Sequence, residues 1–119
     1  MMKYFFLFLF SLVLQSFVPP ANPQLFPTNL EITVRDEVGN IVEGATVRLF
    51  KTQEDYDKGQ KLVQEARKTD AKGRVVFREL EAIEYYVQAE KGDLDNSAAG
   101  VKTNVLTPKK TNKITVIIS

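Results

Sequence analysis

The stretch from residue 30 to residue 89 constrains the fold of this 119-residue chain more than any other part of the sequence. Within it, apolar and polar residues alternate in four runs: 30–35, 45–49, 74–78 and 84–90. A period of two is typical of strands that bury one face. Short segments with Asp, Asn or Gly, at 36–40 and 69–73, separate the runs and predict tight turns. Together these features predict a small antiparallel β-sandwich.

The remaining sequence extends this expectation to further strands and one helical turn. We predict seven strands: 30–35, 41–51, 62–68, 74–78, 84–91, 101–106 and 113–118. The third of these has few apolar residues, so we expect it at a sheet edge. Residues 52–59 predict a single helical turn, because Thr52 suits its N-cap and Gly59 suits its exit. Residues 92–100 predict a loop.

The N-terminal residues indicate export. Residues 1–21 are typical of a secretory signal peptide, with Lys3 as the basic start and a long apolar run after it. That run has about 15 residues and a spanning helix needs roughly 20, which favours a cleaved leader over the alternative of a retained membrane anchor. Residues 22–28 contain Pro23 and Pro27 and predict an extended linker. We therefore expect one domain at 29–119, located in the periplasm or outside a bacterial cell.

The composition argues against several classes of chemistry. The chain has no cysteine and no histidine. It therefore cannot use disulfides, a thiolate nucleophile, a lipid-anchoring cysteine, Ser-His-Asp catalysis or His-ligated zinc. We expect no enzyme activity, no cofactor and no metal, although mechanisms based only on carboxylates or lysines stay open. Without Lys3, the 16 basic residues become 15, equal to the 15 acidic ones, and a neutral domain is a poor partner for nucleic acid.

Two motifs resemble a known family. Residues 34–49 read Val-x-Asp-x-x-Gly-x-x-Val-x-Gly-Ala-x-Val-x-Leu, residues 69–80 read Thr-Asp-x-x-Gly-x-Val-x-Phe-x-x-Leu, and Tyr-x-Val follows at 85–87. This pattern resembles the carboxypeptidase regulatory-like domain family, which is related to the B-type repeats of collagen adhesins. The resemblance implies a prealbumin-like (transthyretin-like), Ig-like fold, that is, a seven-stranded antiparallel Greek-key β-sandwich. It says little about activity, because its Gly and Asp residues shape turns and its apolar residues fill the core.

The same resemblance implies a candidate contact patch. In the family, the second strand lies beside the Tyr-x-Val strand, so that Phe50 and Tyr86 share the outward face of one sheet. With Tyr56 nearby, they predict an aromatic surface that stacks on a sugar ring or receives a partner protein. The alternative is an ordinary cross-strand pair that Lys and Arg side chains such as Arg48 cover.

The loop after residue 92 carries side chains with oxygen atoms: Asp93, Asp95, Asn96 and Ser97. Such oxygens are the ligands that Ca²⁺ prefers. An EF-hand, however, requires Gly at its sixth position and Glu at its twelfth, where this chain has Ala98 and Asn104. We expect Asx turns and solvated acids here, and no metal site.

These features predict an exported, non-catalytic binding or interaction module that presents a sheet face or loops to a protein or glycan of the cell envelope. We expect no nucleic-acid partner and no stable membrane span after processing. The alternative is an inert structural or accessory domain of the envelope, which would gain support if the outward aromatic residues were covered. An enzyme that uses only carboxylates would require two acids facing each other across a cleft.

Overall fold

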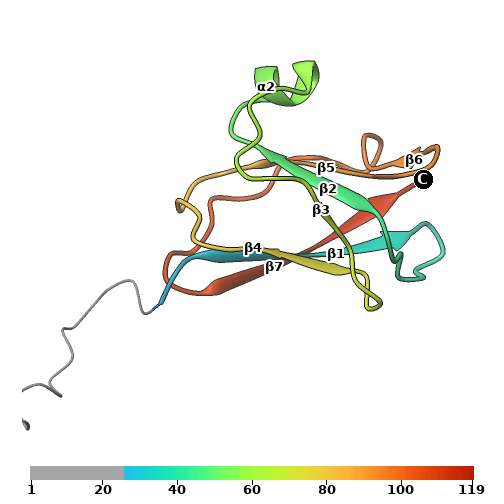
Figure 1. Ribbon diagram of the computed structural model, residues 1–119, viewed down its shortest axis with the longest axis horizontal. Helices are drawn as coiled ribbons and strands as arrows, with labels where there is room; N and C mark the ends of the chain where they lie inside the picture. The colour runs from blue at the N-terminus through green and yellow to red at the C-terminus, as the bar shows by residue number, and fades with distance from the viewer. Residues whose placement is uncertain (1–25) are drawn as a thin grey trace, which may run out of the picture.

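The computed structural model describes residues 26–119, so the predicted signal peptide and most of the predicted linker lie outside the described residues. Its elements are β1 (Asn29–Asp36), β2 (Thr46–Phe50), α2 (Gln53–Lys58), β3 (Arg67–Lys68), β4 (Arg74–Phe77), β5 (Tyr86–Lys91), β6 (Leu94–Asp95) and β7 (Thr111–Ile118). The strands form a three-stranded sheet in the order β4-β1-β7 and a four-stranded sheet in the order β3-β2-β5-β6 (Figure 1). Within residues 26–119, no helix is long and apolar enough to cross a membrane.

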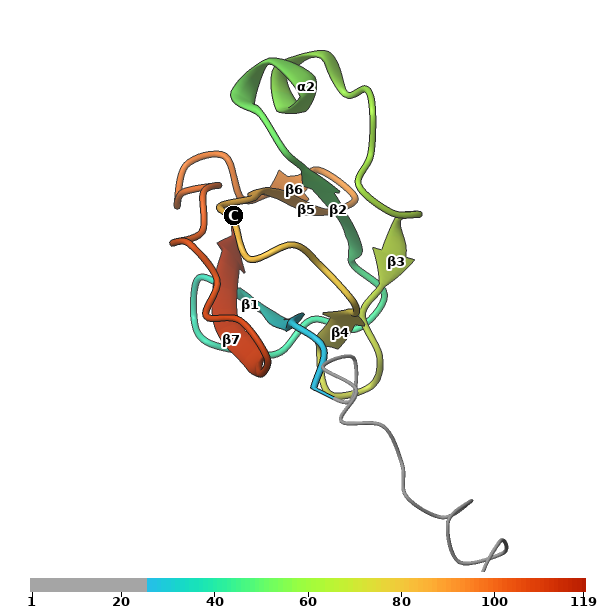
Figure 2. The same ribbon diagram turned by 90° about the vertical axis from the view of Figure 1, so that its left-hand side faces the viewer.

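The core lies between the two sheets (Figure 2) and is filled by alternate residues of both. On β1, for example, Leu30, Ile32 and Val34 are fully buried, while the residues between them are only partly buried. The same alternation buries Val47 and Leu49 on β2. A fully buried aliphatic or aromatic side chain contributes about 1.5–3 kcal/mol relative to an exposed one. The predicted two-layered β architecture is therefore confirmed, and so are the predicted inward faces of β1 and β2.

The prediction that all strand pairs are antiparallel is wrong for β1 and β7, which run parallel along their whole length. The cause is the place where the chain enters β7. Residues 101–103 run back along the start of β5, with the Val87 N–H donating to the Val101 carbonyl. The chain therefore arrives where β1 begins, and the Asn29 N–H donates to the Lys110 carbonyl at 3.0 Å. A strand that starts beside the start of β1 has to run in the same direction.

The predicted strand at 101–106 is also wrong, since only an isolated bridge between Tyr86 and Lys102 forms there. The backbone pairing is limited to two hydrogen bonds, from the Val87 N–H to the Val101 carbonyl and from the Thr103 N–H to the Tyr85 carbonyl. The Thr103 side chain adds a third contact, since its hydroxyl accepts from the Tyr85 N–H at 3.0 Å. The short β6 lies instead in the predicted loop, and β2 and β3 are shorter than predicted. The predicted strand set is therefore confirmed only in part, and the Greek-key path stays a prediction.

The predicted helical turn is confirmed as α2, which projects from the four-stranded sheet (Figure 1). The Thr52 hydroxyl caps it by accepting a hydrogen bond from the Asp55 N–H at 3.0 Å. Gly59 ends it in the left-handed region with φ of 62°. Thr28 of the predicted linker is buried, and its carbonyl accepts a hydrogen bond from the Leu80 N–H at 2.8 Å.

Candidate binding surface

The structure brings together the three aromatic residues of the predicted contact patch. Phe50, at the end of β2, is the register partner of Tyr86, at the start of β5. Tyr56 comes from α2, and its ring lies edge-on to that of Phe50, with the centroids 5.7 Å apart and the planes at 89°. The Tyr56 and Tyr86 ring centroids are 6.5 Å apart. Such edge-to-face geometry is favourable for aromatic rings.

The expectation that Phe50 forms part of a bare surface is wrong, because Phe50 is 0% exposed. The ring of Tyr56 packs against it. Phe50 lies outside the main core between the sheets, so these aromatic residues form a second, smaller core on the outer face of the four-stranded sheet. Tyr56 and Tyr86 are half-buried and keep part of their surface in solvent. Burial raises the pKa of the Tyr56 hydroxyl.

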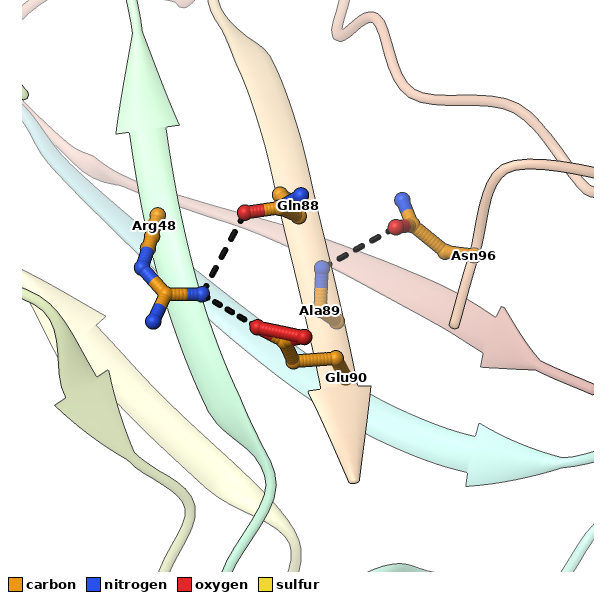
Figure 3. Close-up of polar contacts among 5 residues, drawn as sticks. All are labelled: Arg48, Gln88, Ala89, Glu90 and Asn96. Carbon is orange, nitrogen blue, oxygen red and sulfur yellow. Dashed lines mark hydrogen bonds and ion pairs between the residues drawn. The ribbon is translucent and has the colours of Figure 1, made fainter. Parts of the chain in front are cut away.

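A row of polar side chains continues this outer face along β2 and β5. Arg48 is the register partner of Gln88, and Glu90 follows two residues later on the same face. The Arg48 guanidinium donates to Gln88 Oε1 at 3.3 Å and to Glu90 Oε2 (Figure 3). The Arg48 and Glu90 side chains are 31% and 41% exposed, so the network is open to solvent. We name Arg48, Gln88 and Glu90 the polar row.

Asn96 lies beside the polar row, at the edge of β5 that faces away from β2 (Figure 3). Its side chain is fully buried. Asn96 Oδ1 accepts from the Ala89 N–H at 3.0 Å, and Nδ2 donates to the Val87 carbonyl at 2.9 Å. One amide side chain therefore replaces a strand residue between the β6 pairing and the bridge to Lys102. The sequence analysis predicted neither this role of Asn96 nor the polar row. The alternation of side chains along β2 and β5 places the polar row on the same face as Phe50 and Tyr86.

The loop around Asn96 matches the expected turn geometry. Asp95 Oδ1 accepts hydrogen bonds from the Ser97 N–H at 3.0 Å and from the Ser97 hydroxyl at 2.7 Å. These hydrogen bonds lower the pKa of the Asp95 carboxyl. Among residues 26–119, no three His, Cys, Asp or Glu residues lie close enough together to hold a metal ion. The Asx turn is thus confirmed.

An open groove of about 450 Å³ lies beside α2. Its lining includes three acids, Asp55, Glu79 and Glu81, so it is the place to consider a carboxylate mechanism. The two glutamates are exposed, and Glu81 forms an ion pair with Lys51 at 2.9 Å. A catalytic acid needs burial or a like charge to keep its proton near neutral pH. The groove supplies no such environment for the two glutamates.

Comparison with known proteins gives a fold and no family. No family model and no curated protein matches the chain. Two crystal structures of the major pilin subunit of Bacillus cereus, one of them a point variant, superpose with TM-scores of 0.52 and 0.51 at 17% and 18% sequence identity. The superposition covers 78% and 77% of this chain but only 30% and 29% of the pilin chains, so this chain matches less than a third of the pilin. At this identity the likeness shows a shared fold alone.

A chlorocatechol 1,2-dioxygenase from Pseudomonas putida is more distant, with a TM-score of 0.47 and 15% identity over 78% of this chain and 60% of the enzyme. A similarity at that level carries no argument about this chain. The predicted membership of the carboxypeptidase regulatory-like family therefore stays a resemblance, and the coarser statement of a β-sandwich-like fold is what the comparison supports.

Proposed function

We propose that this protein is an exported, non-catalytic binding module that contacts a glycan through the outer face of its four-stranded sheet. The observation that carries the proposal is the polar row, which continues directly into the half-buried rings of Tyr56 and Tyr86. Binding sites commonly combine aromatic surface with a few oriented polar groups. Here Arg48 offers donors, Glu90 offers an acceptor, and the tyrosine rings offer apolar surface beside them.

The polar row is held in place before any ligand arrives. Its members sit on paired strands, and the Arg48 guanidinium bonds to both Gln88 and Glu90. Behind it, Asn96 fixes the edge of β5. Groups whose positions are already fixed lose less conformational freedom on binding, which favours affinity.

The composition supports a non-catalytic role. Histidine and cysteine are absent from the chain. The two glutamates of the groove are exposed and lack the burial that tunes a catalytic carboxyl. The N-terminal signal-peptide pattern supports export to the periplasm or the cell exterior. The carboxypeptidase regulatory-like motifs fit an accessory domain of this kind, and they carry no catalytic group of their own.

The proposal is tested by retention of the purified protein on immobilised glycans and cell-envelope extracts. We expect Arg48→Ala with Tyr86→Ala to weaken retention at least about tenfold, since losing one or two oriented contacts costs roughly 1–3 kcal/mol. The matched control removes the exposed ion pair of Lys51 and Glu81 (2.9 Å) by Lys51→Ala with Glu81→Ala, and should retain wild-type binding. Equal retention of the two double variants would refute this surface.

A second candidate, an inert structural or accessory domain, is favoured by the complete burial of Phe50 under Tyr56. On that view the aromatic residues only anchor α2 to the sheet. The candidate predicts no retention of the wild-type protein on any glycan or envelope extract, together with a marked loss of stability when Tyr56 is removed. The retention experiment therefore separates the two candidates.

A further inference from the structure

The outer face of the β4-β1-β7 sheet carries more basic than acidic side chains. Its basic residues come from all three strands or their ends: Arg35 on β1, Arg74 and Arg78 on and just after β4, and Lys113 on β7. We name these four residues the cationic face. It lies on the side of the molecule opposite α2 (Figure 1).

The strand register places Arg35, Arg74 and Lys113 on one surface, and Arg78 continues the alternation of β4 one residue past its end. Leu30, Ile32 and Val34 of β1 point into the core, so the residues between them point outward. Thr33 pairs with Arg74 on one side and with Thr115 on the other, and Glu31 pairs with Lys113. Arg74, Arg78 and Lys113 are exposed, whereas Arg35 is half-buried and donates to the Gly39 carbonyl at 2.7 Å.

Nearby acids balance only part of the charge on this face, since Asp70 lies near Arg74 and Glu31 faces Lys113. Glu31 is the one acid that the register places among the four bases. Within residues 26–119, the ion pairs join Arg48 to Glu90, Lys51 to Glu81, Lys58 to Glu54 and Lys102 to Glu84, and none involves the cationic face.

The described chain as a whole is neutral, with 15 basic and 15 acidic residues in 26–119, so the excess on this face is matched by acids elsewhere. Several of them lie on or near α2: Glu54, Asp55 and Asp57. Charge segregated in this way creates a potential that attracts a partner of opposite sign.

We propose that the cationic face binds an acidic polysaccharide, that is, an extended chain with carboxylate or sulfate groups. The four bases span three strands, about 10 Å across, and about 13 Å along β4 from Arg74 to Arg78, from strand spacing and rise. An array of that size suits repeated charges on a flat, extended polymer better than one small anion. The hydroxyls of Thr33 and Thr115 lie among the bases and can bond to sugar hydroxyls.

A membrane surface fits this face less well. A protein that binds in the lipid interface also inserts apolar side chains. The exposed large apolar residues of the described chain are Phe26, Val38, Ile41, Leu62, Leu94 and Val105, and none of them lies on the three strands of this sheet. The site is also separate from the polar row, which belongs to the other sheet, so the inference does not rest on the proposed function.

The experiment measures binding of the purified protein to polygalacturonate, heparin and neutral dextran at 50 and 200 mM NaCl. We expect binding to at least one of the two acidic polymers, none to dextran, and clear weakening at the higher salt, because salt screens exposed charges. The variant Arg74→Gln, Arg78→Gln, Lys113→Gln should bind at least about tenfold more weakly, by analogy with the loss of cationic contacts to other polyanions. Removal of the acid that faces Lys113 by Glu31→Gln should tighten binding.

The matched control is Lys51→Gln, Lys58→Gln, Lys102→Gln, which removes the same net charge from residues outside the cationic face and should bind within about twofold of wild type. Circular dichroism checks that each variant is folded. If the triple variant does not fold, Glu31→Gln decides, and unchanged or weaker binding overturns the proposal. Absence of binding to both acidic polymers, equal losses in the two triple variants, or stronger binding to vesicles of anionic lipid than to the acidic polymers also overturns it.

Discussion

Asn96 offers the sharpest test of how this fold closes its four-stranded sheet. Its buried amide makes three hydrogen bonds to the backbone, at 3.0 Å from the Ala89 N–H, 2.9 Å to the Val87 carbonyl and 3.1 Å to the Gly100 carbonyl. Residue 100 is exposed, so its carbonyl can be rehydrated when the amide is removed. Residues 87 and 89 are almost fully buried, so their freed backbone groups would stay without partners.

The expected magnitude follows from those two groups. Each buried, unsatisfied backbone group costs about 1–3 kcal/mol, so Asn96→Ala should lower the free energy of unfolding by about 2–6 kcal/mol. That is a large share of the roughly 5–15 kcal/mol that stabilises a typical domain. Asn96→Asp keeps the acceptor for Ala89 but loses the two donated bonds. It should be destabilised at neutral pH, and less so in acid, where the protonated carboxyl can donate.

The assay is urea unfolding followed by circular dichroism, with amide hydrogen exchange at Ala89 as a local probe. With a slope of about 1–2 kcal/mol/M, the midpoint of Asn96→Ala should fall by at least about 1 M, and Ala89 should exchange faster. The control Asn104→Ala changes an exposed residue and should stay within about 0.5 kcal/mol of wild type. If the stability of Asn96→Ala equals that of Asn104→Ala, the Asn96 amide does not replace a strand at the edge of β5.

Three further predictions concern the small aromatic core and the turn at 69–73. Tyr56→Ala should lower stability by about 1–3 kcal/mol and expose Phe50, detected as increased binding of a hydrophobic dye; unchanged dye binding would contradict the covering role. Two backbone N–H groups lower the pKa of Asp70, so its stabilisation is present above the unfolded-state pKa and is lost as pH falls through the lower folded-state value. In Asp70→Asn, the free energy of unfolding should therefore fall less steeply than in the wild type as the pH drops below about 4. An equally steep fall in both proteins would refute this. Gly73 has a φ of 73°, and a Cβ added there would lie only 3.1 Å from a backbone carbonyl oxygen. In thermal unfolding, Gly73→Ala should lower the free energy of unfolding by about 2–4 kcal/mol. Gly59→Ala, where an added Cβ meets open space, should lower it by only about 1 kcal/mol.

The sequence predicted the candidate site only in part. It placed Phe50 and Tyr86 opposite each other on one face, and the register confirms that pairing. It did not show that Tyr56 would lie over Phe50, because the direction in which α2 projects depends on packing and not on the helix cap. It also left the polar row unnoticed, although the strand pairing that joins Phe50 to Tyr86 also brings Arg48 opposite Gln88. Which of these facing side chains form hydrogen bonds depends on their conformations in the folded protein.

The features that the sequence by itself determined are local ones. A period of two decides which residues of β1 face the core, and Thr52 and Gly59 decide where α2 begins and ends, because the groups involved are within a few positions of one another. Only the tertiary structure decided the parallel course of β7, the use of Asn96 as an edge residue, and the gathering of charge on the β4-β1-β7 sheet. Each of these depends on which segments, far apart in the chain, the connections bring together. The order of side chains along one strand does not determine that.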